Sequence, residues 1–208
     1  MIQKLKKVLY TVDLSHPDAV VIVKSLDDST VLAASIALYR AACVIARVKY
    51  EQGEIRRIVP ASVLRHAKSL GDLASPEIMM VTPDDWRIET LRALEQANKV
   101  AEASVRVSDL RPIKELRTKL LVIRKPHCEL VITRKGINCT CELGKVTIPA
   151  KLIQPGRIGL NVRYLVDAVK NLITRKVVNV AVVRHKETNI LVLSSQHERH
   201  YIVEMEAK

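Results

Sequence analysis

A change of hydrophobic period within residues 157–205 constrains the fold more than any other feature of the sequence. Apolar residues first recur at helical spacing after Asn161, whose side chain can accept a hydrogen bond from a free backbone N–H and so begin a helix. The apolar stripe of this helix consists of Val162, Leu165, Val166, Val169 and Leu172. From Val178 onward the period becomes two, which predicts strands at 178–183, 190–193 and 201–205. Together with a short strand at 157–160, this pattern predicts an α+β unit in which one helix covers one face of an antiparallel sheet.

The rest of the chain alternates in the same way between helical and strand patterns. Helices are expected at residues 5–12, 60–70 and 108–121, the last capped by Ser108 or Asp109. Strands are expected at 19–23, 31–35, 44–48, 55–59, 77–81, 86–91, 105–107, 129–133, 137–143 and 146–148. Residues 51–54 are expected to close a hairpin, and residues 92–103 to form a short helix or a connector.

Two parts of the chain repeat one another. Residues 53–70 correspond to residues 156–172, because each has a glycine turn, a strand and then a helix. The sequence therefore predicts two tandem domains, 1–104 and 105–208. The first domain is expected to lack most of its leading strand, since only Met1 to Gln3 precede the helix that includes Lys4.

Specific residues in both halves resemble one known family. The run Leu160-Asn161-Val162-Arg163-Tyr164-Leu165, the ending Tyr201-Ile202-Val203-Glu204-Met205 and the earlier Val59-Pro60-Ala61 resemble the bacterial DNA polymerase III beta sliding clamp, a DNA-replication processivity factor. This resemblance implies two DNA-clamp-like domains, each with an antiparallel sheet and two helices on one face. It also implies that Val203 and Met205 bind a partner. The family's subunit has three domains and ends in a Pro-containing Arg-Leu tail, whereas this chain has length for two domains and lacks that tail.

The charge of the chain points to a polyanionic partner. The formal net charge is +12, and aromatic residues make up 3% of the chain, which disfavours base stacking of single strands. Each of the four expected helices carries basic residues away from its apolar stripe: Lys4, Lys7, Arg65, Lys68, Lys114, Lys119, Arg163 and Lys170. If these helices line a clamp, the residues would hold the phosphates of duplex DNA without reading bases.

The resemblance implies a sliding-clamp-like protein that binds double-stranded DNA and tethers a DNA polymerase or other replication and repair proteins. A homo-oligomer is expected, with three two-domain chains completing a ring of six domains. Two alternatives are open: a clamp-fold DNA-binding or adaptor protein that forms no ring, and a sequence-specific regulator that reads DNA with the helix of Arg163. No leader or membrane-spanning segment is expected, so the protein is placed in the cytoplasm.

No pattern for catalysis, a cofactor or a metal was found in the sequence. It contains no glycine-rich phosphate loop and no metalloprotease motif, so an enzyme is not expected. The paired acids at 27–28 and 84–85 and the cluster 197–200 are interpreted as turns. The C-x-C pair Cys139 and Cys141 would share one face of a strand. The four cysteines are expected to be free thiols that pack as small apolar residues, with no metal.

Overall fold

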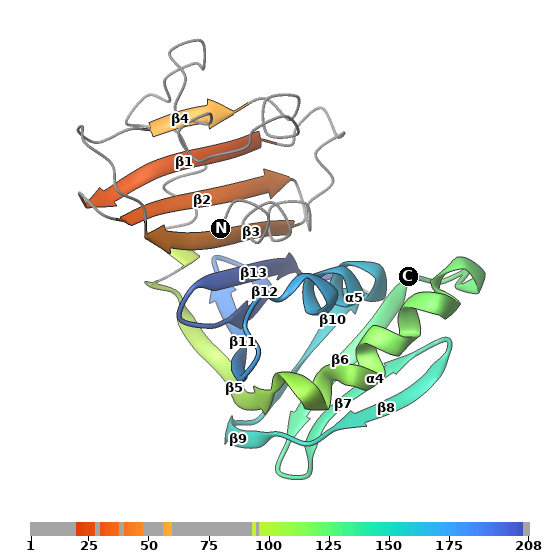
Figure 1. Ribbon diagram of the computed structural model, residues 1–208. Coiled ribbons are helices and arrows are strands. Elements are labelled where there is room, and N and C mark those ends of the chain that lie inside the picture. Colours follow the sequence, from red (N-terminus) through yellow and green to blue (C-terminus); the bar gives the residue numbers. More distant parts are fainter. Residues whose placement is uncertain are drawn as a thin grey trace. The chain divides into compact units, whose positions relative to one another are not determined.

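A computed structural model describes the backbone of residues 20–27, 30–37, 40–47 and 56–59, and the backbone and side chains of residues 93–94 and 96–205 (Figure 1). The chain divides into two compact units, Met1–Arg92 and Ala93–Lys208. The expected domain boundary at 104/105 falls within strand β5 (Asn98–Arg106), which belongs to the second unit. The described part of the chain contains no helix long and apolar enough to cross a membrane.

The described part of the first unit is an antiparallel sheet with the order β4-β1-β2-β3. Its strands are β1 (Val20–Asp27), β2 (Thr30–Ala37), β3 (Arg40–Arg47) and β4 (Arg56–Val59). Strands β1 and β2 pair antiparallel with Asp27 opposite Thr30, as expected for a turn at the paired acids 27–28. The predicted hairpin at 51–54 is wrong, since β4 pairs with β1. The link from β3 to β4 is longer than the two to five residues of a usual hairpin loop, so it does not dictate which strand β4 joins.

Several expectations for the first unit lie outside the described residues. They are the helices at 5–12 and 60–70, the strands at 77–81 and 86–91, the missing leading strand, and the candidate DNA-binding residues Lys4, Lys7, Arg65 and Lys68.

The second unit contains two sets of antiparallel strands. One set is a four-stranded sheet with the order β10-β6-β7-β8, and the other has the order β13-β12-β11-β5-β9. The first set comprises β6 (His127–Thr133), β7 (Gly136–Cys141), β8 (Gly144–Ile148) and β10 (Gly156–Asn161). The second comprises β5, β9 (Lys151–Gln154), β11 (Val177–His185), β12 (Thr188–Ser194) and β13 (Glu198–Val203). The strand predictions for residues 129–148 and 157–205 are confirmed in type, with boundaries shifted by a few residues.

Residues 93–94 and 96 are helical, in line with the short helix expected at 92–103, but strand β5 corrects that expectation from Asn98 onward. Ala101, Ala103 and Val105 are buried, whereas the residues between them are less buried, which is the period of two of a strand. Alanine favours helices in isolation, but here pairing with β11 and burial of one face stabilise the extended form. The short strand β9, which was not predicted, pairs with β5.

Helices pack against both sets of strands (Figure 1). Residues 107–122 form one helical stretch made of η2 (Val107–Leu110), α4 (Arg111–Glu115) and η3 (Leu116–Val122). Only its middle is α-helical, so the single helix expected at 108–121 is corrected. Asp109 does not cap it and instead pairs with Arg106 at 2.9 Å. Pro112 lies in the first turn of α4, where its missing N–H costs nothing.

Helix α5 (Val162–Asn171) begins as predicted, because the Oδ1 of Asn161 accepts a hydrogen bond from the Arg163 amide at 3.0 Å. It follows β10 of the four-stranded sheet and precedes β11 of the other set. The expected arrangement of one helix over one sheet is therefore corrected: α5 connects two sheets around a common core. That core includes Val166 and Val169 of α5, Ile158 and Leu160 of β10, and Val180 of β11.

Candidate nucleic-acid interface

Four predicted DNA-binding residues lie on helices that contact one another. Lys114 is on α4, Lys119 on η3, and Arg163 and Lys170 on α5, and α5 contacts both α4 and η3. The opposite sides of these helices are buried through residues such as Ile113 and Leu165. Lys119 and Arg163 are exposed, and Lys114 and Lys170 are half-buried. We call these four residues the helical cation set.

Among the described residues, no ion pair joins a carboxylate to a member of the helical cation set. The exposed ion pairs there join other residues: Lys99 with Glu102, Arg106 with Asp109, Arg111 with Glu115, and Arg157 with Glu129. The guanidinium of Arg163 lies 3.5 Å from the carbonyl oxygen of Ile123. The positive charges on these helices therefore remain available to a polyanion.

Two neighbouring residues modify this charge. Arg117, which is not among the predicted DNA-binding residues, is exposed on η3 and adds a cation to the same helical stretch. Asp167 lies between Arg163 and Lys170 at helical spacing on α5 and offsets part of their charge. The helical cation set and Arg117 are thus exposed or half-buried cations of the kind that contacts phosphates.

The predicted partner-binding residues lie at the end of the described chain. Val203 ends β13 and Met205 follows it, and both are half-buried. The Met205 amide donates a hydrogen bond to the carbonyl oxygen of Gly159 at 2.9 Å, and the Glu204 amide donates to that of Asn189 at 2.9 Å. Two backbone hydrogen bonds therefore hold the tail, residues 203–205, on β10 and on the start of β12.

Gly159 permits the close approach of the tail to β10. A Cβ at this position would lie 2.6 Å from the carbonyl oxygen of Met205 and 2.8 Å from the Nε2 of His127. We expect Gly159→Ala to displace the tail and to destabilise the second unit by about 1–3 kcal/mol, as overpacking does. Amide exchange should then be faster at Met205. Asn179→Ala, an exposed strand position, is the control, and unchanged exchange at Met205 in Gly159→Ala would contradict this account.

Glu198 is a structural residue that the sequence placed in a turn. It begins β13 and is 1% exposed. Its carboxylate accepts hydrogen bonds from the backbone amides of Ile173 at 2.9 Å and Thr174 at 2.7 Å, just after α5, and lies 3.3 Å from the Nε2 of His200. It therefore fixes the turn from α5 to β11. The turn interpretation of 197–200 is wrong for Glu198 and His200, which both lie buried in a strand.

The described residues contain no cluster of three or more His, Cys, Asp or Glu side chains that could hold a metal ion. Cys128 and Cys139 are buried free thiols, as the sequence predicted, and Cys141 is half-buried.

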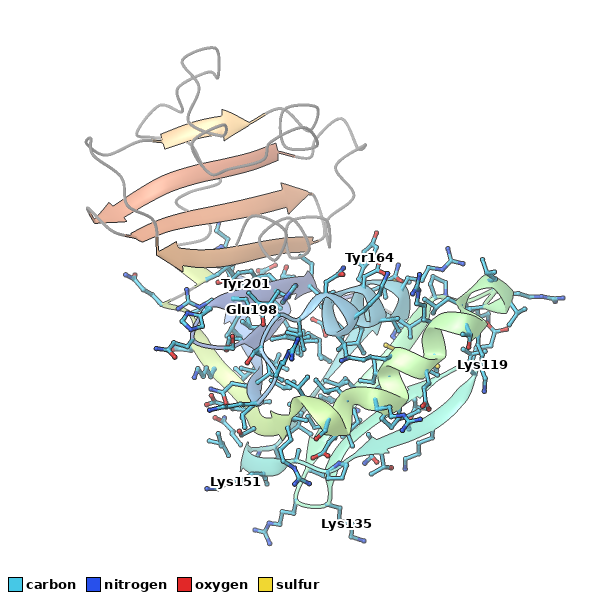
Figure 2. The ribbon with its side chains drawn as sticks, in the orientation of Figure 1. Lys119, Lys135, Lys151, Tyr164, Glu198 and Tyr201 are labelled. Carbon is cyan, nitrogen blue, oxygen red and sulfur yellow. The ribbon has the colours of Figure 1, made fainter. Side chains whose placement is uncertain are left out.

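Figure 2 shows where three of the lysines lie. Lys119 is on the helical stretch, whereas Lys135 is at the turn between β6 and β7 and Lys151 is on β9.

Structural similarity identifies the fold that carries these residues. No family model and no curated protein matches the sequence. Among solved structures, the DNA polymerase sliding clamp from Bacillus subtilis matches with a TM-score of 0.73 at 15% identity, over 100% of this chain and 62% of that chain. The DNA polymerase III beta chain from Streptococcus pneumoniae matches with a TM-score of 0.72 at 14% identity, over 99% of this chain and 63% of that chain. The beta subunit from Thermotoga maritima matches with a TM-score of 0.67 at 10% identity, over 100% of this chain and 63% of that chain.

The chain therefore has the fold of these clamps and spans about 63% of their length. The sequence-based prediction of a shortened clamp fold, of the α+β class with antiparallel sheets, is confirmed.

Proposed function

We propose that this protein is a non-catalytic, sliding-clamp-like DNA-binding protein. It holds duplex DNA through the helical cation set, without reading sequence, and tethers replication or repair proteins. The clamp fold over the whole chain supports this function, because the matched proteins are DNA polymerase clamps. The observation that carries it is the helical cation set, four basic side chains on contacting helices that form no ion pair among the described residues.

Binding of unrelated duplex sequences as a function of salt concentration tests this proposal. A protein that contacts only phosphates should bind all of them with the same affinity, and log affinity should fall steeply and linearly with log salt. A strong preference for one sequence would favour a regulator that reads bases with α5. Absence of duplex binding at low salt would contradict the proposed function.

The proposed partner site is the tail that contains Val203 and Met205. Their half-buried apolar side chains, on a backbone tied to Gly159 and Asn189, are suited to contact an apolar peptide of a polymerase or repair protein. Chemical-shift changes at these two residues on addition of such a partner would support the assignment, and changes confined to other residues would contradict it.

We also propose that the protein assembles with copies of itself, and an exposed apolar pair supports this. Leu121 and Val122, at the end of η3, are 94% and 70% exposed. The same helical stretch contacts β8, an edge strand of the four-stranded sheet among the described strands, and such edges can pair between subunits. An exposed apolar pair on the helical stretch that packs on a free sheet edge is suited to a subunit contact.

Glu142 holds the segment that follows this apolar pair. Its carboxylate accepts hydrogen bonds from the amides of Lys125 at 2.8 Å and Arg124 at 2.9 Å. The Lys125 N–H, and then that of Arg124, hold the pKa of Glu142 below its usual value. A carboxyl whose folded pKa is lowered contributes stability above its unfolded pKa and loses it as the pH falls through the folded pKa, so the segment should stay tethered at neutral pH.

Replacing Leu121 and Val122 together by Asp is expected to weaken self-association by at least about a hundredfold, because two apolar side chains are lost and two charges would be buried. Light scattering after size exclusion should show the mass of one chain for the variant and of three chains for the unaltered protein. Asn179→Asp with Thr188→Asp adds the same charge at exposed strand positions and should leave the mass unchanged. A monomeric unaltered protein would leave the adaptor alternative in place of the ring.

A further inference from the structure

Three cysteine thiols lie on the inner face of the four-stranded sheet. Cys128 is on β6, and Cys139 and Cys141 are two residues apart on β7. In the antiparallel register Cys128 lies directly opposite Cys141, whereas Cys139 lies opposite Leu130. Because side chains alternate along a strand, all three thiols point to the same face.

The register makes one pair suitable for a disulfide. Directly opposite residues of antiparallel strands have Cα atoms about 4.5–5.5 Å apart, within the roughly 4.4–6.8 Å that a disulfide spans. Diagonal neighbours such as Cys128 and Cys139 have Cα atoms about 7–8 Å apart, which is too far for a bridge without backbone movement. Cys128 and Cys141 can therefore be joined by side-chain rotation alone.

The thiols differ in their surroundings. Cys128 and Cys139 are buried in the core, whereas Cys141 is half-buried at the end of β7. The Cys128 thiol donates a hydrogen bond to Cys139, which together with burial raises the pKa of Cys128, and this hydrogen bond lowers the pKa of Cys139. Burial also raises the pKa of Cys141. A small oxidant from solvent thus reaches Cys141 first, and finds it mainly as a thiol at neutral pH.

We propose that Cys141 and Cys128 form a peroxide-driven, reversible cross-strand disulfide. Hydrogen peroxide oxidises the Cys141 thiol to a sulfenic acid and is reduced to water. The Cys128 sulfur then attacks the Cys141 sulfur, the S–O bond breaks, and a second water leaves with the Cys128 proton. Two thiols lose two electrons and two protons, the peroxide is reduced to two waters, and a dithiol reductant reverses the bridge.

The bridge would lie next to the segment that carries the exposed apolar pair. Cys141 precedes Glu142, which holds the amides of Arg124 and Lys125, and Cys128 lies shortly after those residues in the chain. Oxidation would therefore tie together the strand ends that anchor the segment after Leu121 and Val122. This inference concerns the thiols themselves and does not depend on the proposed function.

The test uses the full chain with Cys43→Ser, which removes the cysteine outside this cluster. The protein is treated with hydrogen peroxide at about pH 8.5, because thiolate is the reactive form. Remaining thiols are then alkylated, and the digested protein is analysed by mass spectrometry. We expect a linked peptide pair whose fragments assign the bridge to Cys128 and Cys141, and its loss after treatment with a dithiol.

Additional substitutions in the same background identify the partner. Cys139→Ser should still form the linked pair, whereas Cys141→Ser and Cys128→Ser should abolish it and should not give a bridge between the two remaining cysteines. In Cys128→Ser, Cys141 should instead accumulate as sulfenic or sulfinic acid. If one of these additional variants does not fold, fragment assignment in the Cys43→Ser protein still shows which two cysteines are linked. A bridge to Cys139, or oxidation of Cys141 without any bridge, would overturn the proposal.

Discussion

Replacing Lys114, Lys119, Arg163 and Lys170 together by Gln is expected to weaken duplex DNA binding by about a thousandfold at physiological salt. Each cation that contacts a phosphate releases a counterion, and this contributes about 0.9 to the slope of log affinity against log salt. Four lost contacts should lower that slope by roughly 3.6 and cost about 4 kcal/mol near 0.15 M salt. Fluorescence anisotropy with a labelled duplex over a range of salt concentrations measures both quantities.

A matched variant separates position from net charge. Lys135, Lys145, Lys151 and Arg184 are exposed on the strands and turns of the same unit, and their replacement by Gln removes the same charge. This control should retain most of its affinity, because only the long-range field of the protein changes. Equal losses of affinity in the two variants would mean that DNA binding depends on the overall charge of the protein and not on the helical cation set.

Glu198→Ala is expected to destabilise the second unit by about 3 kcal/mol. The substitution removes the carboxylate that accepts hydrogen bonds from the Ile173 and Thr174 amides, and an N–H left unsatisfied in a buried place costs about 1–3 kcal/mol. The turn from α5 to β11 should open first, because these two amides are its anchor. Since the chain has two compact units, hydrogen exchange at core amides of β11 and β12 is a better measure than a single unfolding midpoint.

Two further substitutions test whether the acceptor atoms of Glu198 cause this loss. Glu198→Gln keeps the shape and one acceptor oxygen, so it should cost less than Glu198→Ala. Glu187→Ala removes an exposed carboxylate from the β11–β12 turn and should change stability by less than about 0.5 kcal/mol. If all three variants lost the same protection against hydrogen exchange, the role of Glu198 as the anchor of the turn from α5 to β11 would be refuted.

Features set by neighbouring residues were predictable from the sequence. Helix α5 and its cap at Asn161 follow from an apolar stripe and one side-chain hydrogen bond, both within a few residues. The basic residues Lys114, Lys119, Arg163 and Lys170 followed from their positions off the apolar stripes. The structure adds Arg117 to these residues, because it lies exposed on η3, a 3-10 helix where the sequence predicted one regular α-helix.

Features set by distant residues were not predictable. The Ala-rich strand β5 is extended because it pairs with β11, whose residues lie far along the chain. Glu198 reads as a turn residue because the amides that it binds, at Ile173 and Thr174, are 25 and 24 residues away. The exposure of Leu121 and Val122 also runs against the usual burial of apolar residues, and no local pattern indicates it.

Lysine footprinting tests most directly whether the helical cation set holds DNA. The protein is acylated with and without saturating duplex DNA, and the rate of modification is measured at each lysine by mass spectrometry. The proposed function predicts protection of Lys114, Lys119 and Lys170, with Lys135, Lys145 and Lys151 unchanged. Protection of the sheet lysines, with the three helical lysines fully reactive in the complex, would contradict it.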